Sequence, residues 1–115
     1  MKLYIDGNIN RYYVQTLCMI FFPGEKFPED EEVTENTPVL SVKLVCTEEK
    51  AVAEASIRYR GEATATKEYP FHDGVTEERT RKLAVGGAGG SCLCVQDALQ
   101  EQMYQNQREQ PYRLP

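Results

Sequence analysis

The sequence predicts an α+β fold of two layers, a mainly antiparallel sheet with helices packed on one of its faces. Three segments between residues 40 and 71 alternate apolar and polar residues with the period of a strand. Apolar residues recur at helical spacing before these segments, from residue 11 to 22, and again after residue 79. With a short strand at the start of the chain, the predicted order is β-α-β-β-β-α, an arrangement that places helices on one side of a sheet.

The first strand and helix are predicted from residues 2–22. Lys2 to Asp6 forms a short strand that stops at Gly7, and Asn8 or Asn10 can cap the helix that follows, because an asparagine oxygen accepts a first-turn amide. Pro23 and Gly24 end this helix. Its apolar arc is wide enough to lie flat on a sheet. The arc consists of Tyr13, Leu17, Ile20 and Phe21, widened by Val14, Cys18 and Phe22.

The three central strands differ in how clearly they alternate. The first places Leu40, Val42, Leu44 and Cys46 on one face, and a turn is predicted at residues 47–50. The second is the most strand-like segment of the chain. Its apolar face consists of Ala51, Ala53, Ala55, Ile57 and Tyr59, and the small alanines suggest that a helix approaches closely. After a turn at Gly61 the third strand runs from Ala63 to Phe71, and Pro70 confines its end to a sheet edge or a break.

The last helix contains an unusual run of glycines. Thr76 is a good cap, and Glu77 and Glu78 suit the positive end of the helix dipole. The cluster Gly86–Gly90 then interrupts the pattern, and each glycine in a helix costs about 0.5–1 kcal/mol relative to alanine. Either packing forces the helix through this cluster, or the helix breaks and restarts near Ser91. A second helical stripe follows, formed by Val95, Ala98, Leu99 and Met103.

Length and composition predict one domain. The 115 residues suffice for a hydrophobic core. We expect this domain to span residues 1–104, with an acidic loop at residues 25–38. The polar segment 105–115 is expected to fray or to dock on a partner.

Charge and hydropathy exclude several classes of partner. The net charge of −5 argues against nucleic acid, whose phosphates need a basic face. No apolar run approaches the roughly 20 residues that span a bilayer, and the first residues lack the apolar core of a signal peptide. We therefore expect a cytoplasmic protein. The acidic residues between Glu25 and Glu35 indicate a solvated loop, since they lack the EF-hand spacing that calcium requires.

The cysteines do not form a recognisable site in the sequence. Without a secretion signal they are expected to be reduced thiols, with Cys18 and Cys46 as small core residues. Cys92 and Cys94 are too few for a structural zinc site, and the only histidine, His72, is twenty residues away from Cys92 in the sequence. Nothing orients His72 as a base toward either thiol. The sequence therefore predicts no metal ligand and no catalytic residue.

Neither the glycine cluster nor the tyrosines predict a ligand site. A phosphate-binding P-loop needs lysine before its serine, but Gly90 precedes Ser91. A dinucleotide fingerprint starting at Gly87 would have Cys92 in place of its last glycine. Tyr12 and Tyr13 are expected to be one core and one rim residue, not an aromatic ligand site. No cofactor-binding residue is predicted.

Several segments nevertheless resemble a known enzyme family. Residues 2–7 (KLYIDG), 11–17 (RYYVQTL) and 21–25 (FFPGE), followed by the three strands and residues 75–83 (VTEERTRKL), are similar to the front domain of the oxygen-independent coproporphyrinogen dehydrogenases of the radical-SAM superfamily. In that family the domain precedes a barrel that holds a [4Fe–4S] cluster and S-adenosylmethionine. The resemblance thus implies a place in haem biosynthesis, where coproporphyrinogen III is oxidatively decarboxylated.

The resemblance carries no catalytic residue onto this chain. The family's cluster needs a Cys-x-x-x-Cys-x-x-Cys run, which is absent here. We therefore expect no cofactor in this chain, and a non-catalytic accessory domain that pairs with a catalytic barrel or another protein. Whether it counts as part of an enzyme stays open. The alternative is a free-standing protein-interaction module, a homodimer formed through an exposed sheet edge or the last helix.

Overall fold

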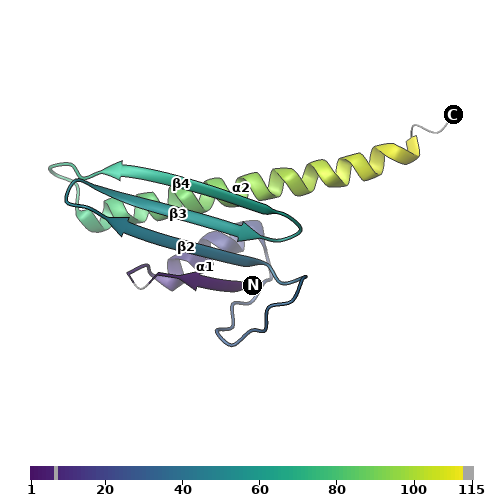
Figure 1. Ribbon diagram of the computed structural model, residues 1–115, viewed down its shortest axis with the longest axis horizontal. Helices are drawn as coiled ribbons and strands as arrows, with labels where there is room; N and C mark the ends of the chain where they lie inside the picture. Colours follow the sequence, from purple (N-terminus) through teal and green to yellow (C-terminus); the bar gives the residue numbers. More distant parts are fainter. Residues whose placement is uncertain (7, 113–115) are drawn as a thin grey trace.

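In the described part of the chain, four strands form one sheet and two helices cover one of its faces (Figure 1). The computed structural model describes the backbone of residues 1–6 and 8–112, and the side chains of residues 1–6 and 8–96. The elements are β1 (Lys2–Ile5), α1 (Arg11–Phe21), β2 (Val39–Cys46), β3 (Lys50–Arg58), β4 (Glu62–Pro70) and α2 (Glu77–Tyr112). This is the α+β order that the sequence predicts.

The sheet is mixed, with spatial order β1-β2-β3-β4. The strands β2, β3 and β4 form an antiparallel meander, as their alternation and short turns predict, whereas β1 pairs parallel to β2. A parallel neighbour needs a crossover, and α1 provides it between β1 and β2. Thr47 closes the first turn, since its N–H donates to the Lys50 carbonyl at 2.9 Å.

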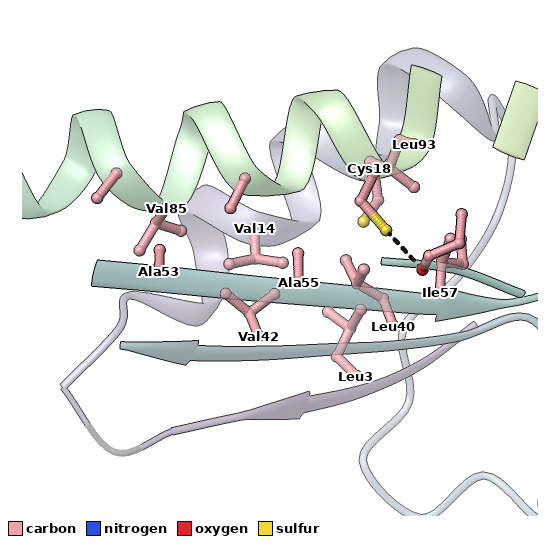
Figure 2. Close-up of a cluster of buried hydrophobic side chains, with 14 of the residues drawn as sticks. Leu3, Val14, Cys18, Leu40, Val42, Ala53, Ala55, Ile57, Val85 and Leu93 are labelled. Atoms are coloured by element: carbon pink, nitrogen blue, oxygen red, sulfur yellow. Dashed lines mark hydrogen bonds between the residues drawn. The ribbon is translucent and has the colours of Figure 1, made fainter. Parts of the chain in front are cut away.

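The core lies between the helices and the meander. Figure 2 shows Val14 and Cys18 of α1 above β2 and β3, with Leu93 of α2 beside them. Both α1 residues are buried, and Asn10 caps that helix by accepting the Tyr12 amide at 2.9 Å. The inward residues of β3 are fully buried, and three of the four are alanines. Those residues are Ala51, Ala53, Ala55 and Ile57.

The helix α2 passes through the glycine cluster without a break. A Cβ on Gly86 would overlap the Tyr13 hydroxyl, and one on Gly89 would lie 2.8 Å from a Leu17 methyl group. A Cβ on Gly87 would lie 3.1 Å from the Tyr69 hydroxyl. These glycines therefore let α2 approach α1 and β4 closely. The sequence left two alternatives, a continuous helix or a break near Ser91, and the continuous helix is confirmed.

Two residues predicted to be in the core are exposed. Ile20 is 71% exposed, because α1 buries only its Val14 and Cys18 stripe and Ile20 points away from it. Cys46 is also exposed, although it shares a face with Leu40 and Val42. It lies at the last position of β2, at the turn end of the sheet. Alternation identified the correct face but not how far along the strand the helices cover it.

The helix α2 continues past residue 104, the predicted end of the domain, to Tyr112. In Figure 1 it extends well beyond the sheet. The side chains of Ala98, Leu99 and Met103, and those of the predicted tail 105–115, lie outside the described residues. The domain boundary therefore stays a prediction.

Candidate interaction surface

The residues that the sequence singled out for chemistry are not brought together. His72 is exposed in the loop before α2, Cys92 is buried, and Cys94 is exposed on another side of the same helix. Within residues 1–6 and 8–96, no group of three or more histidine, cysteine, aspartate or glutamate residues is placed to hold a metal ion. The described residues therefore give no geometric support for a metal site or for a catalytic pair of His72 with Cys92 or Cys94.

The two buried thiols are placed for packing. Burial raises the pKa of the Cys18 thiol from its ordinary value of 9.0 to about 12, while the ammonium group of Met1 lowers it and Cys92 adds to the rise. Burial also raises the pKa of Cys92, whose S–H donates to the Ala63 carbonyl at 3.1 Å. A nucleophilic cysteine needs a lowered pKa. Both residues instead pack in the core between the helices and the sheet.

The acidic loop is held against the start of the chain. The Met1 ammonium lies 3.2 Å from a Glu25 carboxylate oxygen and 3.1 Å from a Glu31 oxygen. Arg11 donates to the Phe27 carbonyl at 3.4 Å. Glu25 and Glu31 are thus paired with the ammonium group, and no group of carboxylates in this loop is placed to hold a metal ion.

The glycine cluster does not form a phosphate-binding turn. Anions bind free amides at a helix N-terminus, but Gly86–Gly90 lie inside α2, where the amides belong to the helix ladder. A small cavity of about 120 Å³ lies nearby, between the start of α1 and α2. Its cations are already paired, since Arg81 lies 3.4 Å from Glu77 and Lys82 lies 3.9 Å from Glu78.

The tyrosines follow the core-and-rim prediction. Tyr13 is half-buried against the core and donates to the Lys82 carbonyl at 3.5 Å, whereas Tyr12 is 75% exposed. They therefore face different surroundings and do not form an aromatic site together.

The strand β4 offers the clearest binding feature of the described chain. It is nine residues long and forms one edge of the sheet. At its start the Tyr59 amide donates to the Gly61 carbonyl at 3.0 Å, and just past its end the Phe71 amide donates to the Glu49 carbonyl at 2.9 Å. Bonded and non-bonded pairs alternate along an antiparallel ladder. The odd-numbered residues of β4 therefore bond to β3.

The even-numbered residues of β4 direct their main-chain groups toward the free edge. Thr64, Thr66 and Glu68 are exposed, and each presents one N–H and one C=O there. Such a row of unpaired main-chain groups is a template for another strand. Only Pro70, the last residue of the strand, lacks an N–H to donate.

The opposite edge of the sheet is a weaker template. The strand β1 has four residues, and the acidic loop lies against it through a hydrogen bond from Lys2 to the Glu29 carbonyl. A strand of four residues offers fewer than half the main-chain groups of β4. Pro70 indicated from the sequence that β4 lies at an edge of the sheet. Which of the two edges is the better template can be seen only from the strand order and the strand lengths.

Comparisons with known proteins give little further information. No family model and no curated protein matches the chain. Among solved structures, a minor lipoprotein from Acinetobacter baumannii matches with 13% sequence identity and a TM-score of 0.43, over 86% of this chain and 94% of that one. Among the described residues, no helix is both long and apolar enough to cross a membrane.

The expected resemblance to the coproporphyrinogen dehydrogenases is wrong. No family model and no curated protein matches the chain, so that family has no support beyond local segments of the sequence. Two of the segments that suggested the family contain elements that recur in many α+β folds. Lys2–Ile5 is an edge strand, and Arg11–Phe21 is a capped amphipathic helix.

Proposed function

We propose that this chain is a non-catalytic protein-interaction module, which accepts an extended segment of a protein partner along the β4 edge. The observation that supports it is the nine-residue edge strand with its unpaired main-chain groups at Thr64, Thr66 and Glu68. Adding a strand to such an edge is a common mode of peptide recognition, in which main-chain hydrogen bonds supply affinity. The core behind β4 is packed by α2, so the edge is held rigid before it binds.

Two further features support an interaction role. The open face of the sheet is polar, with Glu54, Arg58 and Thr66 exposed, which keeps the edge soluble while it is unoccupied. The helices cover only the other face. The exposed thiols Cys46 and Cys94 suit a reducing compartment, so a cytoplasmic location stays our prediction.

The experiment is a titration of isotope-labelled protein with a short synthetic peptide of alternating threonine and valine, an extended probe with no sequence taken from this chain. We expect the amides of Thr64, Thr66 and Glu68 to shift and to become protected from hydrogen exchange. The inward amides of Ala63 and Ala65, which already bond to β3, are the internal control. Shifts confined to β1 or to the open face, or no shifts at all, would contradict the proposal.

A variant sharpens this test. Thr66→Pro removes one outward N–H but leaves the bonds between β3 and β4 in place, because Thr66 does not bond inward. We expect it to weaken peptide binding by about tenfold, since a lost hydrogen bond near the centre of the edge also displaces its neighbours. An unchanged circular dichroism spectrum would show that the fold is kept. Equal affinity of the variant and the parent protein would argue that the peptide binds elsewhere.

A further inference from the structure

The β4 edge is complementary to a second β4 edge that runs antiparallel to it. Resting on the proposed function, we propose that its partner is a second copy of this chain, with the two β4 strands paired antiparallel about a two-fold axis at Thr66. The strand runs from Glu62 to Pro70, so Thr66 is its midpoint. Full overlap of two such strands therefore places Thr66 opposite itself, a symmetric closed contact of the kind that most homodimers use.

The direction of the main-chain groups allows this register. Even-numbered residues point outward, and in the Thr66-centred register even-numbered residues meet even-numbered residues. Thr64 then bonds to Glu68 of the second copy, and Thr66 bonds to its own equivalent. About eight main-chain hydrogen bonds form along the seam, with only the Pro70 amide position missing. The two helix-covered faces end up on the same side of an eight-stranded sheet.

The charges and the length of β4 favour this register over those centred on Ala65 and on Thr64. With Ala65 on the axis, Glu62 would lie opposite Glu68 of the second copy at both ends of the seam, and like charges directly opposite each other are destabilising. With Thr64 on the axis, Glu68 and Pro70 would extend beyond the paired strand. In the Thr66-centred register Glu68 faces a neutral threonine, while it keeps its ion pair to Lys50 at 3.2 Å.

Side-chain size on the helix-covered side agrees with the same register. The first half of β4 carries small residues there, Ala63 and Ala65, and the second half carries long ones, Lys67 and Tyr69. Antiparallel self-pairing about Thr66 sets Ala63 opposite Tyr69 and Ala65 opposite Lys67. Each long side chain thus lies beside a small one across the seam, which avoids crowding.

The experiment combines sedimentation with a cysteine cross-link. In a Cys46→Ser, Cys94→Ser background, Thr66→Cys places two thiols opposite each other at a Cα separation of about 5.5 Å, within the range of a disulfide. We expect a concentration-dependent dimer that mild oxidation locks covalently. The matched control Thr64→Cys lies opposite Glu68 of the second copy, about 14 Å from its own equivalent, and should stay uncrosslinked.

The outcomes separate the register, the dimer and the proposed function. A cross-link through Thr64→Cys but not Thr66→Cys would overturn the register. A chain that stays monomeric at all concentrations, yet binds the threonine-valine peptide at β4, would overturn self-pairing and leave the proposed function standing. A monomer that also fails to bind the peptide would overturn both.

Discussion

The two faces of the sheet are made by the same strands but are built under different constraints. On the covered face, Ala53 and Ala55 have no exposed surface, because the backbone of α2 lies close above them. On the open face, Glu54 and Arg58 of the same strand are exposed. On the covered face the size of the side chains is restricted by the helices. On the open face the side chains need only be polar enough to keep the sheet soluble. Changes of size should therefore be costly on one face and nearly neutral on the other.

The largest difference should come from truncating a core residue. We expect Ile57→Ala to lower the free energy of unfolding by about 3 kcal/mol, because Ile57 is fully buried and the mutation leaves a cavity under the helices. Arg58→Ala, the next residue along β3, is the control, and its change should stay within about 0.5 kcal/mol. Urea unfolding curves measure both. Similar losses for the two variants would mean that the open face is also packed.

Two adjacent glycines should respond with opposite signs. Gly89→Val inserts a branched side chain where a Cβ would already lie 2.8 Å from Leu17, and we expect a loss of about 2 kcal/mol. Gly90→Ala adds a methyl group in open space and improves helix propensity, so it should stabilise the monomer by up to about 1 kcal/mol. Thermal unfolding at low protein concentration distinguishes them. Loss of stability in both variants would contradict the contrast between the two positions.

The buried Cys18 thiol predicts a dependence on alkaline pH. Its pKa is 9.0 when unfolded and about 12 when folded, so between these values the unfolded state releases a proton that the folded state retains. Stability from this group is complete below pH 9 and falls by up to about 1.4 kcal/mol per pH unit above it. Unfolding measured from pH 8 to 11 should show a shallower decline for Cys18→Ala than for the parent protein. Identical slopes would exclude this linkage.

The smallest effect should come from the ion pair on the open face. Lys50 and Glu68 are 3.2 Å apart, and both side chains are more than two-fifths exposed. Solvent screens such pairs, so a double-mutant cycle with Lys50→Ala and Glu68→Ala should give a coupling energy of less than about 1 kcal/mol. Repeating the cycle in 1 M salt (about a 3 Å screening length) should reduce it further. A larger coupling energy that resists salt would place this pair in a more buried setting than the monomer shows.

Much of the fold could be predicted from local patterns. Alternation identified β3 and its alanine face, and the Asn10 cap and the turn at Thr47 were visible because their chemistry is local. The exposure of Ile20 and Cys46 could not be predicted, because periodicity indicates which face of an element is apolar but not where the neighbouring element ends. The parallel pairing of β1 with β2 also depends on contacts between distant segments.

The candidate site was less predictable than the fold. Its main-chain groups belong to Thr64, Thr66 and Glu68, ordinary residues that carry no motif. What makes them available is the position of β4 at the end of the strand order, together with the direction in which each amide points. Neither property is encoded within the strand itself. The incorrect family resemblance, in contrast, rested on short local segments of a kind that occurs in many folds.

The glycines inside α2 also affect the order in which the molecule assembles. A segment with four glycines in five positions has little tendency to form a helix alone, so an isolated peptide of residues 76–96 should be largely unstructured in water. We therefore expect the helix to form only against the surface that the meander and α1 provide, after the hairpins of β2, β3 and β4. During synthesis the alanine face of β3 should then stay uncovered until the ribosome has released the residues up to Leu93.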